Sequence, residues 1–205
     1  MNKIKTVIIL LSLFTLFQCK TTEPELGKIE AEGLTQEDQK AISSVRKFIG
    51  YVRYSKKSEK FAGKAIEMID LDDVCNLLLD NKFNALSVED KNKFKSLIGE
   101  HVQLKAFPQA LKYFEKIDLV YGKPTTQADR ITIPSTLVYK GSDRIKFSWV
   151  VSKKNYKIVD LLNEKNSSSM KESRDTQILP YFNKQGIKGL NEKLEQINSM
   201  LKKSS

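Results

Sequence analysis

The 205-residue chain is poor in the residues from which catalytic and metal sites are usually built. Its single histidine, His101, has no cysteine or second histidine at ligand spacing, which argues against a metal site of the usual kinds. A G-x-S-x-G motif, a Walker loop and a G-x-G-x-x-G motif are all missing from the sequence. We therefore expect no enzyme, with no catalytic residue, no metal and no cofactor. A hydrolase would have to rely on Asp160, Tyr156 and His101, the only candidates for that role.

The apolar run at the N-terminus, residues 7–17, has only eleven residues. Eleven residues are too few to span a hydrocarbon core of roughly 30 Å. Lys3 and Lys5 precede the run and Cys19 follows it, an arrangement that resembles a secretory signal peptide ending in a bacterial lipobox. We expect residues 1–18 to be a signal peptide and Cys19 to be lipidated, which would make the mature chain periplasmic and membrane-anchored. The alternative is an ordinary signal peptide with a cysteine there by chance.

Cysteine occurs only twice, at Cys19 and Cys75. Lipidation of Cys19 would leave one thiol, so no intramolecular disulfide could form even in an oxidising compartment. The sequence around Cys75, DVCNLLLD, indicates a small buried apolar residue and not a reactive thiol. We therefore expect the stability of the protein to come from packing alone.

Acidic residues are outnumbered, because the chain has 35 Lys and Arg against 25 Asp and Glu and a formal charge of +10. Loss of Lys3 and Lys5 with the signal peptide lowers this charge by two, to +8. The basic residues are scattered along the sequence, which favours anionic surfaces such as lipid head groups as partners. Export from the cytoplasm argues against nucleic acid.

The sequence divides into a signal peptide (1–18), a lipidated cysteine with a flexible tether (19–33) and one folded domain (34–205). The tether contains Pro24, Gly27 and Gly33 and shows no apolar periodicity. The folded domain is long enough to bury a sizeable core of its own.

Helical periodicity dominates the first part of the domain. Thr35 and Asp38 form a capping pair, and apolar residues then recur at three- and four-residue spacing up to Val52. Further helices are expected over residues 60–69, 71–80 and 87–107, the last of them capped by Ser87. Pro108 should interrupt this last helix, and the chain should continue helically with Pro108 in the first turn.

From residue 117 the period changes to two, which predicts a four-stranded antiparallel meander with strands over residues 117–122, 129–139, 144–152 and 155–162. One face of the third strand is strongly apolar, whereas Lys146 and Ser148 lie on the other face; the apolar face carries Ile145, Phe147, Trp149 and Val151. Helical patterns return over residues 170–186 and 189–201. Helices, then a sheet, then helices predict an α+β domain in which helices cover the apolar sheet face.

Four segments of the domain together resemble the MlaC family, also called the toluene-tolerance auxiliary-component family. The segments are IDLDDVCNLLL, FNALSVEDKNKF, FPQALKYF and YKIVDLLNEKNSSSMKESR, and their order and spacing are similar to those in the family. The individual positions that match are Phe83, Ser87, Glu89, Phe94, Tyr156, Asp160, Ser168 and Arg174.

The resemblance implies a periplasmic phospholipid-binding protein that carries lipid between the outer and inner membranes and so maintains outer-membrane lipid asymmetry. It also implies two protein partners, an MCE-domain ABC complex of the inner membrane and a lipid-transfer complex of the outer membrane, and we expect a monomer. An apolar cavity between the sheet and the helices would hold the lipid. Together with the two-residue alternation, the resemblance predicts that the cavity is lined by Leu111, Phe114, Leu137, Phe147, Trp149 and Ile158.

Two alternatives remain open from the sequence. The apolar residues of the sheet could pack against the helices in a filled core. In that case the chain would be a membrane-anchored structural or adhesive lipoprotein without a lipid cavity, and its basic surface would bind anionic polymers.

Overall fold

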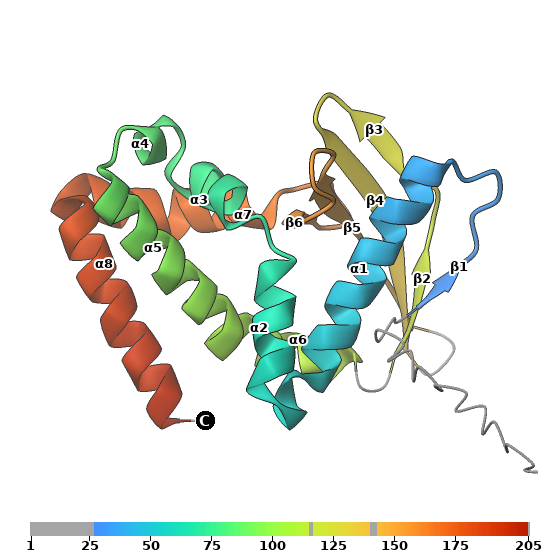
Figure 1. The fold of residues 1–205 in the computed structure, drawn as a ribbon, viewed down its shortest axis with the longest axis horizontal. Coiled ribbons are helices and arrows are strands. Elements are labelled where there is room, and N and C mark those ends of the chain that lie inside the picture. Colours follow the sequence, from blue (N-terminus) through green and yellow to red (C-terminus); the bar gives the residue numbers. More distant parts are fainter. Residues whose placement is uncertain (1–26, 115–116, 140–142, 205) are drawn as a thin grey trace, which may run out of the picture.

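The structure is a computed structural model and describes residues 27–114, 117–139 and 143–204. In Figure 1 a twisted sheet lies on one side, with helix α1 running across one of its faces. Helices α3, α4, α5, α7 and α8 form a second group beside it, and α2 and α6 lie between the two. The predicted α+β class is therefore confirmed.

The longest helix of the N-terminal half, α1 (Gln36–Tyr54), begins at the predicted cap. The Asp38 amide donates to Thr35 Oγ1 over 3.1 Å, and the Thr35 amide donates to Asp38 Oδ2 over 2.9 Å. This reciprocal pair satisfies two amides that have no partner within the helix. The helix buries Ile42, Val45 and Ile49 completely, so its apolar stripe faces the core.

Four shorter helices and a 3₁₀ turn follow α1. They are a 3₁₀ turn (Ser55–Lys57), α2 (Glu59–Glu67), α3 (Leu71–Leu79), α4 (Asn81–Asn84) and α5 (Val88–His101). Ser87 caps α5 as predicted, since its hydroxyl oxygen accepts from the Asp90 amide over 3.1 Å. None of the helices in the described residues combines the length and the apolarity needed to cross a membrane.

Two prolines follow wide helical turns. A π-helical turn (Val102–Ala106) joins α5 to α6 (Phe107–Phe114), and a second one (Arg174–Ile178) joins α7 (Ser169–Ser173) to α8 (Leu179–Lys203). In each case the residue before the proline donates its amide five residues back, from Phe107 to Val102 and from Leu179 to Arg174. Proline lacks an N–H and its ring crowds the preceding turn, which the wider turn relieves. Pro108 therefore lies in the first turn of α6, as predicted, but the chain stays helical across it.

The sheet has the order β1-β2-β4-β5-β6, and β3 pairs with the N-terminal end of β4. Its strands are β1 (Lys28–Ile29), β2 (Ile117–Tyr121), β3 (Thr125–Gln127), β4 (Arg130–Tyr139), β5 (Asp143–Ser152) and β6 (Ile158–Leu162). The four predicted runs form β2, β4, β5 and β6, and all their pairings are antiparallel. The short strands β1 and β3 are additional. Strand β1 runs parallel to β2, so part of the segment predicted as a tether joins the sheet.

Hydrogen bonds join the sheet to the helices at one end of β6. The Ile158 amide donates to the Met68 carbonyl and the Asp70 amide donates to the Ile158 carbonyl, both over 2.8 Å. Arg130 on β4 pairs with Asp73 of α3 over 2.6 Å. The two layers are thus held tightly together at this end of the sheet.

Candidate functional site

The helix-facing side of the sheet is closed at one end and open at the other. Along β5, Val151 is fully buried and Trp149 is 3% exposed, whereas Ile145 is 51% exposed. The ring of Trp149 lies edge-on between Phe48 of α1 and Phe147, at centroid distances of 5.8 and 5.5 Å. The predicted apolar face therefore exists, but the helices cover only part of it.

A β-bulge in β6 decides which residues reach the open end. Val150 pairs with Asp160 and Val151 pairs with Ile158, so Val159 is an extra residue in this strand. Beyond the bulge Leu161 stands opposite Trp149. Leu161 is 37% exposed on the open side, whereas Ile158 is buried at the closed end.

An apolar groove of about 410 Å³ occupies the open end. Its walls come from β4, β5, β6 and α6, and its apolar lining consists of Ala110, Leu137, Ile145, Phe147, Trp149, Leu161 and Leu162. Polar residues at the start of α7 and in the loop before it complete the lining; they are Asn163, Ser167, Ser169 and Glu172. The groove can thus hold an apolar chain with a polar group at one end.

Three residues of the predicted lining, Leu137, Phe147 and Trp149, come together in the groove. Leu111 and Ile158 are not among its lining residues and belong to the hydrophobic core. Phe114 is the last residue of α6, and its side chain lies outside the part of the chain that the structure describes.

Four apolar residues of the groove are missing from the predicted set. Ala110 takes the place expected for Leu111, because Leu111 and Phe107, four residues apart, direct the buried side of α6 into the core. Leu161 and Leu162 lie beyond the bulge, which changes the alternation of β6. Ile145 could have been predicted to line the groove, because the two-residue alternation of β5 places it on the same face as Phe147 and Trp149.

The carboxylate of Asp160 fixes the loop at the rim of the groove. It is buried and accepts hydrogen bonds from the Ser168 hydroxyl, from Ser169 Oγ over 3.0 Å, from the Met170 amide over 3.1 Å and from the Leu161 amide over 2.7 Å. Ser168 also caps α7, since its hydroxyl oxygen accepts from the Lys171 amide. The arrangement explains Asp160 as a structural residue that orders the start of α7.

His101 and Cys75 likewise have structural surroundings. His101 Nδ1 lies 2.9 Å from Asn198 Oδ1 and ties α5 to α8. Because the Asn198 amide group donates to the Leu97 carbonyl and to Glu100, its oxygen is the acceptor and the His101 proton is assigned to Nδ1. Burial, with a smaller effect of Asp72, raises the pKa of Cys75 to about 12. The described residues contain no cluster of side chains that could hold a metal ion.

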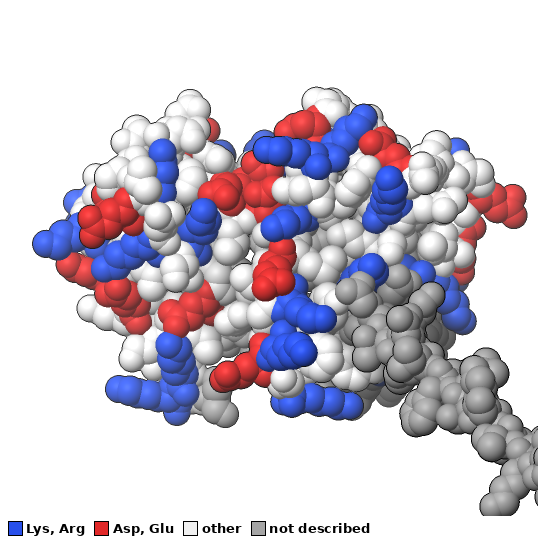
Figure 2. Space-filling model, viewed as in Figure 1, with Lys and Arg blue, Asp and Glu red and all other residues white. Residues whose placement is uncertain are grey.

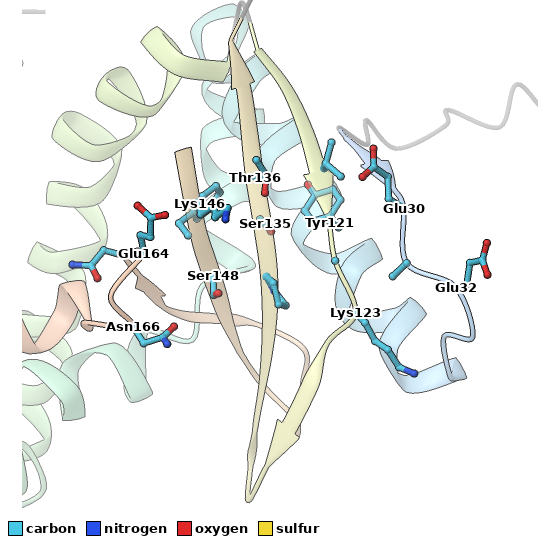
Figure 3. A pocket seen from close by; sticks show the side chains of 16 residues that line it. Glu30, Glu32, Tyr121, Lys123, Ser135, Thr136, Lys146, Ser148, Glu164 and Asn166 are labelled. Carbon is cyan, nitrogen blue, oxygen red and sulfur yellow. The ribbon is translucent and has the colours of Figure 1, made fainter. Parts of the chain in front are cut away.

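A second hollow of about 600 Å³, lined by both apolar and polar residues, lies on the outer face of the sheet, away from the helices (Figure 3). Its charged residues are of both signs and comprise Glu30, Glu32, Lys123, Lys146 and Glu164. On the face shown in Figure 2, Lys and Arg are interspersed with Asp and Glu. The scattering of basic residues expected from the sequence is therefore seen on that face.

Taken together, the fold and the groove define an α+β protein with an open apolar site between a sheet and its covering helices. A solved structure has a similar fold, that of a phospholipid-binding protein from Ralstonia solanacearum in complex with a phospholipid. The TM-score is 0.65 at 13% sequence identity, over 82% of this chain and 99% of the other. No protein-family model and no curated protein matches the sequence.

Proposed function

We propose that this protein binds a phospholipid in the groove between the sheet and the helices and carries it through the periplasm between the outer and inner membranes. The observation that carries the proposal is the exposure of Ile145 and Leu161 at the open end of an otherwise buried apolar face. A filled core would have covered both side chains. The fold shared with a protein solved in complex with a phospholipid supports the same interpretation.

The energetics of the groove suit a carrier. An acyl chain of about 16 carbons gains roughly 12 kcal/mol when it leaves water, at about 0.8 kcal/mol for each methylene. The groove offers seven apolar residues for this purpose. Its polar residues come from α7 and the loop before it, so the polar group of the lipid can lie near this loop while the chain lies against the apolar walls.

The proposed role in the cell rests on the sequence. Export by residues 1–18 and acylation of Cys19 would hold the protein at a membrane, and both segments lie outside the described residues. Docking to an MCE-domain ABC complex and to an outer-membrane complex would then hand the lipid on and preserve lipid asymmetry. We propose no chemical step for this protein, which would act as a carrier and not as an enzyme.

The test begins with protein purified from a bacterial periplasm or membrane fraction. Mass spectrometry should find co-purifying phospholipid, and delipidated protein should transfer labelled phospholipid between two vesicle populations. A structural or adhesive lipoprotein would come out empty and leave the transfer rate at its uncatalysed value. That pair of results would reject the proposal.

The chain carries a built-in probe for titrations. Trp149 is its only tryptophan and lies in the groove wall, so its fluorescence reports on the groove alone. A phospholipid with brominated acyl chains should quench this emission, because bromine quenches indole only in close contact. Absence of quenching in protein that retains the lipid would place the lipid elsewhere.

A further inference from the structure

Helix α1 runs along the sheet from the closed end to the open end. Ser44 Oγ in its first half donates over 2.6 Å to the carbonyl of Tyr156, which lies in the turn between β5 and β6 at the closed end. The ring of Phe48 then meets Trp149, and the helix continues for about 9 Å to Tyr54. In Figure 1 this end of α1 lies at the lower edge of the molecule, whereas β3 and the closed end lie at the upper edge.

A basic segment, residues 53–64, begins where α1 ends and includes the 3₁₀ turn and the first part of α2. Its only acidic residue is Glu59. Its five basic residues are Arg53, Lys56, Lys57, Lys60 and Lys64. Arg53, Lys57 and Lys60 are exposed, and within the described part of the chain Arg53 and Lys60 have no ion-pair partner. The segment therefore presents a local excess of positive charge to solvent.

Aromatic rings hold two of these lysines in place. Lys57 Nζ lies 5.0 Å from the ring centroid of Tyr54, and Lys64 Nζ lies 5.2 Å from that of Tyr51. Phe61 packs against both rings, at centroid distances of 6.1 Å to Tyr51 and 5.7 Å to Tyr54. Tyr54 is 37% exposed. The charges are thus positioned before a partner binds, next to an aromatic ring of the kind that suits a membrane interface.

The apolar groove opens at the same end of the molecule. Ile145, its most exposed apolar residue, lies four residues from Trp149 along β5, on the side away from the closed end. Helix α6, which contributes Ala110 to the groove, lies against α1. The open end of the groove and the basic segment therefore share one end of the domain.

The N-terminal chain enters the sheet from this end as well. Strand β2 begins at Ile117, which stands opposite Tyr139, the last residue of β4, so β2 starts at the open end. Strand β1 is parallel to β2 and therefore also runs from the open end toward the closed end. Only residues 20–26 separate Cys19 from the described chain, a distance of at most about 29 Å when extended. Acylation of Cys19, as proposed above, would place the open end nearest to the anchor.

We propose that the basic segment, with the exposed ring of Tyr54, is a docking surface for an anionic phospholipid bilayer. Docking there turns the open end of the groove toward the membrane. Charge complementarity supports this partner, because each basic residue close to an anionic bilayer strengthens binding about fivefold. The inference goes beyond the proposed function and does not depend on what the groove holds.

The first experiment measures binding to protein-free vesicles. The Cys19→Ala chain is used so that no acyl anchor contributes, and sucrose-loaded vesicles of phosphatidylglycerol or of phosphatidylcholine are sedimented with it. We expect binding to phosphatidylglycerol only, weakening as the salt concentration rises. Equal binding to both lipids, or no binding to phosphatidylglycerol, would overturn the inference. Binding to soluble polyglutamate without binding to vesicles would also overturn it, because the partner would then be an acidic protein.

The second experiment locates the surface with two variants that each lose three positive charges. One variant combines Arg53→Gln, Lys57→Gln and Lys60→Gln and should bind phosphatidylglycerol vesicles at least tenfold more weakly. The matched control removes exposed lysines on α4, on the β5–β6 turn and on α8, by Lys82→Gln, Lys154→Gln and Lys184→Gln. It should bind within about twofold of the parent chain. An equal loss in both variants, or no loss in the first, would exclude the basic segment as the docking surface.

The third experiment tests the orientation on the bilayer. An environment-sensitive fluorophore is attached through Glu59→Cys or, on α4, through Asn84→Cys, each in the Cys19→Ala chain, where the remaining cysteine, Cys75, is buried. Phosphatidylglycerol vesicles should shift the emission to the blue at position 59 and leave position 84 unchanged. No shift at position 59, or an equal shift at both positions, would overturn the orientation. Circular dichroism establishes that every variant is folded.

Discussion

Replacing Leu161 with aspartate should remove lipid from the groove and leave the protein folded. Leu161 is 37% exposed and stands opposite Trp149 at the open end of β6. Full burial of a leucine is worth about 1.5–3 kcal/mol, so losing this partly buried side chain should cost about 1–2 kcal/mol of stability. Trp149→Asp is a poorer test, because Trp149 is 3% exposed and its loss would damage the core itself.

The effect on binding should be larger than the effect on stability. A carboxylate in the groove wall must be desolvated against the acyl chain, or it must bring water with it, at a cost of roughly 2–7 kcal/mol. Since about 1.4 kcal/mol corresponds to a factor of ten, the affinity should fall at least about 30-fold. Phosphorus analysis and mass spectrometry of the purified variant should find it nearly free of phospholipid.

Two controls accompany this variant. Val88→Asp introduces the same charge at a residue that is 74% exposed, in the first turn of α5, where an acidic side chain is favourable. Leu161→Met keeps the apolar volume. Both should retain lipid at the wild-type level. A folded Leu161→Asp protein with unchanged lipid content would refute the assignment of the groove.

Three further predictions concern the rest of the chain. In cells fed a clickable fatty acid, the protein should be labelled and Cys19→Ala should not be; equal labelling of the two would disprove acylation. Asp160→Ala should lower the free energy of unfolding by about 2–4 kcal/mol in urea titrations, because several donors lose their acceptor; an unchanged midpoint would contradict this structural role. With its pKa raised from 9.0 to about 12, Cys75 should be alkylated at pH 9 at least about a hundredfold more slowly in the native than in the urea-unfolded Cys19→Ala protein. Equal alkylation rates would contradict the burial of Cys75. The raised pKa also predicts that the free energy of unfolding falls as the pH rises from about 9 toward 12, because in this range the Cys75 thiol ionises only in the unfolded chain.

Local signals predicted much of the fold. Thr35 with Asp38, and Ser87 with Asp90, mark helix starts because a capping hydrogen bond depends only on residues three apart. The alternation of Phe147, Ser148 and Trp149 likewise gave the face of β5 on which each side chain lies. These features arise within a few residues, so a single sequence contains them.

The rest depends on contacts between distant segments. The bulge at Val159 places Leu161 opposite Trp149, and the first residue of β6 also bonds to the chain between α2 and α3, which is far away in the sequence. Strand β1 has only two residues and pairs with β2, which is far away in the sequence, so no local sequence pattern predicts it. The side of α6 that faces the groove depends on the π-helical turn before Pro108. Leu111 and Ile158, which the sequence analysis placed in the predicted lining, lie in the core because of these long-range effects.

Residues 144–147 of β5 have β4 on one side and, among the described residues, no strand on the other, and this open edge bears on the solubility of the protein. An open strand edge presents free amides and carbonyls to which a strand of another molecule can pair, the usual beginning of edge-to-edge aggregation. Arg144 and Lys146 are both exposed on this stretch, and two copies brought together here would oppose like charges. Removal of both charges should thus promote self-association in concentrated solution.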